Sequence, residues 1–228
     1  MMKGNTFIND LLKLIFTATA IANIADNAAS SPLTNLYLSL HTADPGAGGN
    51  QTTSETAYTG YARQAVARSG VGFTVSGQSV TLAATVSFPA AATTDTDVLS
   101  FFGVGTASSG TGKLLYSGAI GSYQGMGTAL AGTEYLTLPS ISGVANNDRI
   151  AVFAPFGGSV PTGLTAGTLY YAINVSGNQL QLSTSSGGSA VNITADGSFM
   201  AYKVTPLVLG GGIAVTPQLT TGTTITEC

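Results

Sequence analysis

The sequence contains very few charged residues, and this shortage narrows what the protein can be. Seven basic and ten acidic side chains make up 7% of the 228 residues, where an ordinary soluble domain has about 25%. The formal net charge is −3, and the basic residues are scattered, with only Arg63 and Arg68 close together. Because nucleic-acid binding needs Lys and Arg gathered on one face, the composition argues against a nucleic-acid partner.

Cysteine, histidine and tryptophan are also scarce. The single cysteine is Cys228, the single histidine is His41, and there is no tryptophan. One cysteine permits no internal disulfide. One cysteine and one histidine are too few for a thiolate or multi-histidine metal site within one chain. We therefore expect no metal site and no cofactor.

In place of charge the sequence has Ser, Thr, Asn, Gln and Gly, interleaved with short apolar alternations. Residues 35–41 (NLYLSLH) show this pattern most clearly, with Leu36, Leu38 and Leu40 on one face. Such alternation is typical of β-strands with hydroxyl side chains outward, so the sequence predicts an all-β fold. Low charge also suits surfaces that press against other protein copies, since little charge has to be desolvated.

An apolar stretch covers residues 11–25 (LLKLIFTATAIANIA). A secretory signal peptide is one interpretation, although Asp10 precedes the run and Lys13 interrupts it. The stretch is too short to span a bilayer, which needs about 20 apolar residues, so we expect no membrane partner. The spacing of three and four between apolar residues favours an N-terminal amphipathic helix within residues 1–30. Whether this segment is retained in the mature protein stays open.

Turn and strand signals predict an organisation in which one β-domain carries an insertion. Residues 31–123 form the first part of a β-sandwich or jelly-roll-like domain, and residues 201–228 supply its closing strands. Residues 124–200 have the short, evenly spaced strands of a small Ig-like β-sandwich, with residues 191–194 expected as its last strand. The Gly-rich residues 121–132 show no clear period. Insertions at exposed loop tips are well tolerated.

Residues 35–46 (NLYLSLHTADPG), followed by residues 60–67 (GYARQAVA), resemble a group of small structural proteins of tailed bacteriophages, often labelled tail-fibre-like or virion proteins. In that group a segment like residues 113–119 (KLLYSGA) runs almost directly into a closing β-segment like residues 210–226. Here a long stretch intervenes, and its residues 163–183 resemble Ig-like β-modules of phage tail and fibre proteins. The resemblance implies a virion protein assembled in the bacterial host cytoplasm.

Three groups of residues are weak candidates for chemistry. Residues 107–114 (ASSGTGKL) echo a phosphate-binding loop but lack its first glycine and the hydroxyl after Lys113. His41 lies near Asp44, but the sequence has no G-x-S-x-G nucleophile motif. Asp95 and Asp97 are half of a glycosidase or Ca²⁺ site at most. Because the resemblance also supplies no catalytic motif, we expect no catalytic residues and a protein that is not an enzyme.

The aromatic residues offer a separate hypothesis of sugar recognition. Tyr58, Tyr61, Tyr170 and Tyr171 are the tyrosines that a saccharide would stack on. Tyr170 and Tyr171 alternate inside a predicted strand, so one of them is expected to pack in the core. A host-surface glycan is kept as a candidate partner of the inserted module.

Three functions follow as hypotheses. The first is a capsid decoration or cement protein on the outer head surface, because low charge and an apolar helix suit close contact with coat proteins. The second is a tail-fibre, collar or other tail-associated structural protein. The third, from a different class, is a carbohydrate-binding module.

In the first two hypotheses the partners are phage coat or tail proteins, and the chain forms a homo-oligomer, a dimer or a trimer. The alternative for the helix is that its stripe packs on the chain's own sheet, and for the arginines that they are solvated. The contact residues expected for such partners are the apolar stripe of the helix and the two neighbouring arginines: Phe7, Leu11, Leu14, Ile15, Ile21, Arg63 and Arg68.

Overall fold

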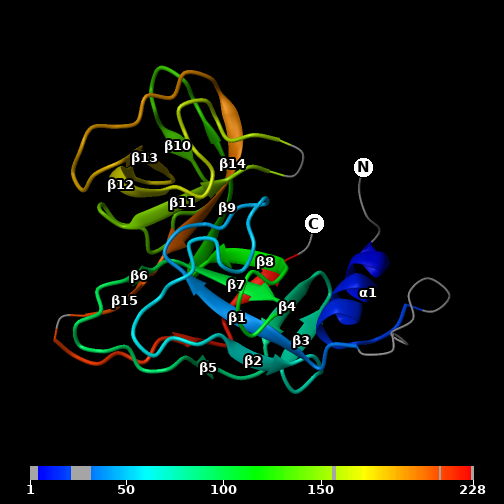
Figure 1. Cartoon of the computed structure of the whole chain (residues 1–228). Helices are drawn as coiled ribbons and strands as arrows, with labels where there is room; N and C mark the ends of the chain where they lie inside the picture. Colours follow the sequence, from blue (N-terminus) through cyan, green and yellow to red (C-terminus); the bar gives the residue numbers. More distant parts are fainter. Residues whose placement is uncertain (1–4, 22–31, 156–157, 211, 227–228) are drawn as a thin grey trace. The chain divides into compact units, whose positions relative to one another are not determined.

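The computed structural model describes residues 5–21, 32–155, 158–210 and 212–226 (Figure 1). Its residue contacts divide the chain into two compact units. Unit 1 consists of Met1–Gly118 and Leu207–Cys228, and unit 2 of Ala119–Pro206. The described ranges contain one helix and seventeen strands, which confirms the all-β fold class with an N-terminal helix.

Unit 1 is built from two sheets and two short ribbons. Its larger sheet has the strand order β2-β1-β7-β8, its smaller sheet the order β17-β4-β3, and the ribbons pair β15 with β6 and β16 with β5. The elements are α1 Asn5–Phe16, β1 Asn35–His41, β2 Gln64–Ala67, β3 Phe73–Ser76, β4 Ser79–Leu82, β5 Val86–Ser87, β6 Val98–Leu99, β7 Phe101–Gly105, β8 Leu114–Ala119, β15 Leu207–Val208, β16 Gln218–Leu219 and β17 Thr224–Thr226.

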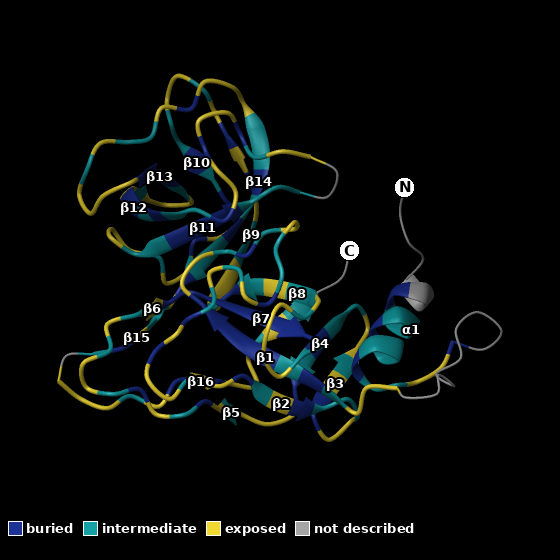
Figure 2. Cartoon of the chain, in the orientation of Figure 1, coloured by how far each residue is buried: buried dark blue, intermediate teal, exposed yellow. Residues whose placement is uncertain are grey.

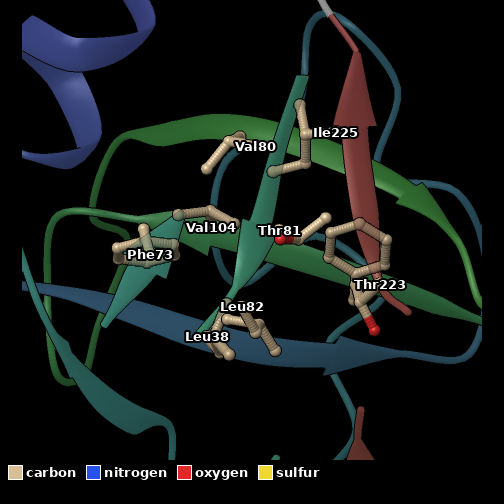
Figure 3. A pocket seen from close by; sticks show the side chains of 9 residues that line it. Leu38, Phe73, Val80, Thr81, Leu82, Val104, Thr223 and Ile225 are labelled. Atoms are coloured by element: carbon tan, nitrogen blue, oxygen red, sulfur yellow. The ribbon is translucent and has the colours of Figure 1, made fainter. Parts of the chain in front are cut away.

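The two sheets of unit 1 face each other as in a β-sandwich. Leu38 and Val104 from the larger sheet meet Val80, Leu82 and Ile225 from the smaller one (Figure 3). The cavity left among these side chains measures about 10 Å³, room for about one water molecule. It is therefore a packing gap and not a ligand site.

The N-terminal helix packs on the smaller sheet of its own unit. Ile8, Leu12 and Phe16 recur four apart and are fully buried, α1 contacts β3 and β4, and the Phe16 ring lies 5.0 Å from that of Phe73 in an edge-to-face contact. The helix ends at Phe16, and Ala18 adopts a positive φ of 56°, as is common just past a helix C-terminus. The predicted helix therefore runs too long; residues 22–31 lie outside the described residues.

Unit 2 is a closed barrel. Its six strands follow the order β10-β13-β12-β11-β14-β9 and return to β10. An apolar cluster that includes Leu136, Ile150, Leu182 and Phe199 fills the interior. The strands are β9 Gly121–Ala129, β10 Leu136–Thr137, β11 Arg149–Phe153, β12 Leu169–Ser176, β13 Gln179–Ser183 and β14 Gly197–Val204.

The barrel corrects the expected Ig-like sandwich. The strand that closes it, β9, lies in the Gly-rich stretch that shows no period in the sequence, and it pairs with both β10 and β14. Glycine allows this close packing, because a Cβ at Gly127 would lie 2.6 Å from the carbonyl oxygen of Thr137, and one at Gly121 would meet the carbonyl of Lys203. Two sheets that would face each other in a sandwich are thereby joined into one.

The bounds of unit 2 also differ from the expected insertion of residues 124–200. Residues 201–204, predicted as part of the first domain's closing strands, belong to β14 of the barrel, and residues 191–194 form no strand. The backbone N–H of Thr205 donates to the carbonyl of Ile120 at 2.7 Å, and Gly121 pairs with Val204. The chain therefore enters and leaves unit 2 on two adjacent strands.

Candidate functional site

Arg63 lies at the centre of a buried polar network in unit 1. Its guanidinium makes a two-pronged contact with Glu55, Nε to Oε1 and Nη2 to Oε2, both at 2.7 Å, and the two side chains are only 3% and 12% exposed. Arg63 also donates to the carbonyls of Ala107 and Gly110, and the Tyr61 hydroxyl donates to Glu55. The hydrogen bonds to Glu55 raise the pKa of Arg63. The guanidinium is thus engaged inside unit 1.

His41, the last residue of β1, belongs to a second buried group. Its Nδ1 lies 2.9 Å from the carbonyl oxygen of Thr53, which can only accept, so Nδ1 carries the proton. Nε2, at 2.8 Å from the Ser39 hydroxyl, then accepts from it in the neutral ring. Burial lowers the pKa of His41 below its ordinary value, which keeps the ring neutral in the fold.

The Ser39–His41 pair lies inside unit 1. Both residues are fully buried, and Figure 2 shows β1 as a buried strand. Asp44, the carboxylate expected nearby in sequence, accepts from the backbone N–H of Gly46 at 3.1 Å, which is the usual role of an Asp at a turn. The arrangement therefore fixes a turn and a strand end.

The carboxylates Asp95 and Asp97 are bound to separate partners within unit 1. Asp95 accepts from the backbone N–H groups of Ala92 and Thr59 at 2.7 and 3.2 Å, and Asp97 accepts from the Thr56 hydroxyl. Across the residues that the structure describes, no three His, Cys, Asp or Glu side chains gather where they could hold a metal ion. The pair fastens loops in this structure.

The residues that echo a phosphate-binding loop form the turn before β8. The carbonyl of Gly110 accepts from Arg63, and a Cβ at Gly112 would meet the buried amide of Gln51. That same amide accepts from the backbone N–H of Ala107 and donates to its carbonyl. The glycines here serve close packing against side chains of the same unit.

Arg68 is attached to the C-terminal end of α1. Its Nε donates to the carbonyl of Ile15 at 2.6 Å, and its Nη2 donates to the carbonyl of Leu14. Carbonyls in the last turn of a helix have no partner within it, and a cation there is favoured by the helix dipole. Burial lowers the pKa of Arg68. Arg68 therefore joins the C-terminal end of α1 to the segment that follows β2.

The predicted apolar stripe of the helix does not coincide with the buried one. Leu11, Leu14 and Ile15 are half-buried, while the neighbouring Ile8–Leu12–Phe16 row described above provides the core contacts. Ile21, past the helix end, is buried, and the side chain of Phe7 lies outside the described residues. The role of these residues as contacts for a partner stays a prediction.

The four tyrosines expected as sugar platforms are largely engaged inside the units. Tyr58 and Tyr170 are buried, and the Tyr58 hydroxyl donates to the carbonyl of Pro89. Tyr61 hydrogen bonds Glu55 and the backbone of Leu40. The guanidinium of Arg149 lies 4.0 Å from the ring centroid of Tyr171, so it covers one face of that ring. The expectation that one of Tyr170 and Tyr171 packs in the core is confirmed for Tyr170.

A group of large apolar side chains lies on the outer face of the unit 2 barrel. Met126, Met200 and Phe153 are directly opposite one another on β9, β14 and β11, and the Tyr202 ring lies 5.1 Å from Tyr123 and 5.6 Å from Phe153. Residues that alternate with these on β14, such as Phe199, face the core. We call the five side chains the outer patch: Tyr123, Met126, Phe153, Met200 and Tyr202.

A β-bulge places Tyr123 in the outer patch. Gly127 and Ala129 face inward and are buried, so strict alternation along β9 would turn Tyr123 inward as well. Instead Gly125 pairs with Ala201 while Tyr123 pairs with Tyr202, so Gln124 is an extra residue on β9. Gly125 takes a φ of +108° there. The bulge reverses the direction of Tyr123, which sequence alternation could not reveal.

The described residues form an all-β fold with one N-terminal helix, in which the charged side chains described above are bonded within their own unit. Residues 11–129 match the family model described as Podophage GP4 fiber I protein gp80. The chain belongs to this family, which confirms the resemblance to structural proteins of tailed-phage virions. No curated protein matches the sequence. In the described part of the chain, no helix has the length and apolarity to cross a membrane.

The family match covers the first segment of unit 1 and the beginning of unit 2, and it leaves out the second segment of unit 1, Leu207–Cys228. It begins within α1, runs through β1–β8 and ends with β9. The remaining strands of the barrel, β10–β14, lie beyond it. The matched region thus contains the first segment of unit 1, including the Arg63 network, and only the first strand of unit 2.

Proposed function

We propose that this chain is a fibre component of a tailed-phage virion, in which unit 1 assembles with other virion proteins and unit 2 is an accessory module. The observation that carries the proposal is the match of residues 11–129 to a family described as a fibre protein. The match covers the first segment of unit 1 and only one of the six barrel strands, β9, which supports the view that unit 1 carries the property common to the family. Unit 2 then adds a function of this particular chain.

The chemistry of the surface supports assembly. Only 7% of the residues are charged, and few charges have to be desolvated when such surfaces meet. Leu11, Leu14 and Ile15 on α1 are not fully buried within unit 1, so they are the residues of the predicted stripe that remain available for a neighbour. Copies joined through several modest contacts gain stability additively, and a closed dimer or trimer is the expected symmetry.

We also propose that the role is structural and involves no catalysis. The groups that the sequence offered for chemistry, His41, Asp44, Asp95 and Asp97, are hydrogen bonded to their own loops and strands. Such engagement is typical of residues that fix a fold.

Capsid decoration, the first of the sequence-based hypotheses, is the competing proposal. The family description favours the fibre hypothesis over it. Quantitative mass spectrometry of purified virions, with the coat protein as internal standard, separates the two. We expect far fewer copies of this chain than of the coat protein, together with labelling at the tail in immuno-electron microscopy. A copy number comparable to that of the coat protein, with label over the head, would contradict the fibre proposal.

A further inference from the structure

We propose that the outer patch of unit 2 binds a neutral oligosaccharide, with the ring of Tyr123 as the surface on which a sugar stacks. The inference rests on the proposed function for its setting, since a module on a fibre can reach the host surface. Binding itself can be measured on the purified chain, so its failure and the failure of the virion proposal are separate results.

The first support is the local cost of exposing Tyr123. The bulge at Gln124 and the positive φ of Gly125 interrupt the longest strand pairing of unit 2, and they bring an aromatic side chain out of the barrel to 53% exposure. Bulges often re-aim a side chain beside a binding site. Met126, three residues further along β9, is also 53% exposed.

The second support is the chemistry of the outer patch and its rim. The aromatic faces carry partial negative charge, and the C–H groups of a sugar ring, polarised by the adjacent oxygens, are attracted to such faces. Polar uncharged residues accompany the patch: Thr128 lies opposite Ser198 on the same face, and Gln124 and Ser122, the chain neighbours of Tyr123, are joined by a hydrogen bond of 2.8 Å from the Gln124 amide to the Ser122 hydroxyl. A few placed polar groups around an apolar surface are typical of small-ligand sites.

The third support concerns charge. The five patch residues include no acidic or basic side chain, and the two basic residues of unit 2 already have partners. Arg149 stacks on Tyr171, and Lys203 pairs with Asp148 at 2.8 Å. An anionic sugar would need a free cation near the patch. The charge distribution therefore matches a neutral saccharide.

The fourth support is the size of the patch, which argues against a second copy of the chain as its occupant. An aromatic side chain buries 150–250 Å² in full, so two half-exposed side chains and three more deeply buried ones offer on the order of 300 Å². A stable protein interface needs about 800 Å² on each partner. The patch is too small for a stable dimer and large enough for a few sugar rings.

The chain offers an internal reporter for this binding. It has four methionines, of which Met126 and Met200 belong to the outer patch, while Met1 and Met2 lie far from it in sequence. In the full-length protein labelled with ¹³C-methyl methionine, titration with maltohexaose, cellohexaose and chitohexaose is followed by NMR. We expect at least one of these neutral sugars to shift the Met126 and Met200 signals and to leave Met1 and Met2 unchanged.

Variants of Tyr123 test its role in the same titration. Replacement Tyr123→Ala is expected to weaken binding at least about tenfold, since it removes the stacking surface, and Tyr123→Phe is expected to bind within about threefold of the original. Tyr123→Leu keeps apolar bulk without an aromatic face, and should also lose about tenfold. The matched control is Tyr135→Ala, a half-buried tyrosine of unit 2 outside the patch. Amide spectra report whether each variant is folded.

Several results would overturn the proposal. They are no methyl shift with any of the three neutral sugars, equal binding of an oligogalacturonate, or full binding by folded Tyr123→Leu. Shifts of Met126 and Met200 that depend on protein concentration alone, and vanish in Tyr123→Ala, would instead identify the patch as a contact between copies.

Discussion

The two units of this chain stabilise β-structure of similar composition in different ways. Unit 1 leaves open edges on two sheets and two ribbons, and it fastens long irregular segments with buried polar side chains such as Arg63 and His41. Unit 2 closes its strands into a barrel, which removes edges altogether, around a cluster of buried apolar side chains, and its buried polar residues Gln181 and Ser183 are uncharged. The comparison teaches that the stability of a chain with few charged residues can still depend strongly on a single buried ion pair, here that of Arg63 with Glu55.

The largest effect that distinguishes the units is expected from Arg63→Met. The variant leaves the Glu55 carboxylate buried without its partner, and breaking a buried pair in this way costs about 3–5 kcal/mol. Denaturant unfolding with hydrogen exchange read separately for peptides of each unit would show the loss in unit 1 alone. The matched control is Lys203→Met, which removes an ion pair about a quarter exposed and should cost unit 2 at most about 1 kcal/mol. Equal losses in the two variants would contradict the contrast.

Unit 2 should lose stability when bulk is added at Gly127, where β9 closes the barrel. In Gly127→Ala the new methyl group would crowd the Thr137 carbonyl and the Phe199 ring, at 2.6 and 2.8 Å, so we expect a loss of roughly 1–3 kcal/mol in unit 2. Gly48→Ala is the control, since nothing lies within 4 Å of a Cβ added there. The free energy of unfolding of this variant should stay within about 0.5 kcal/mol of that of the original protein. A barrel that accepts Gly127→Ala without loss would show that β9 is not tightly packed.

A smaller, pH-dependent effect is expected from His41. Because burial lowers its pKa in the folded state, the unfolded chain takes up the proton more readily. The contribution to stability is therefore complete above the ordinary pKa of about 6.5 and declines as pH falls below it, by at most about 1.4 kcal/mol per pH unit. His41→Asn should flatten the stability of unit 1 between about pH 6.5 and 5. If the free energy of unfolding of His41→Asn fell with pH as steeply as that of the original protein, a group other than His41 would be responsible for the pH dependence.

Local pattern in the sequence predicted the strands that have one apolar face. Residues 35–41 are β1 as expected, and residues 149–153 are β11, because alternation and β-branched residues express burial on one side directly. Ser76 likewise pairs with Ser79 where a two-residue turn joins β3 to β4. These features depend on neighbours in the chain, which a sequence displays.

What escaped prediction depends on contacts between distant residues. β9 was missed because its glycines are chosen for close approach to β14, and glycine carries no alternation. The row of α1 that packs on the sheet, Ile8, Leu12 and Phe16, could not be told from the neighbouring apolar row by spacing alone, because α1 is apolar on several sides. Arg63 was expected on the surface because nothing in the sequence shows that Glu55 and the carbonyl of Ala107 converge on it. The bulge that exposes Tyr123 was invisible for the same reason.

The central claim is that unit 1 suffices for assembly and unit 2 is an accessory module. Its most direct test is a phage in which residues 120–205 are replaced by a short Gly-Ser linker, which the pairing of Gly121 with Val204 allows. The purified variant is expected to unfold cooperatively, and virions should contain it at the copy number of the unaltered chain by mass spectrometry. Virions that lack the folded variant would contradict the account, because assembly would then require unit 2.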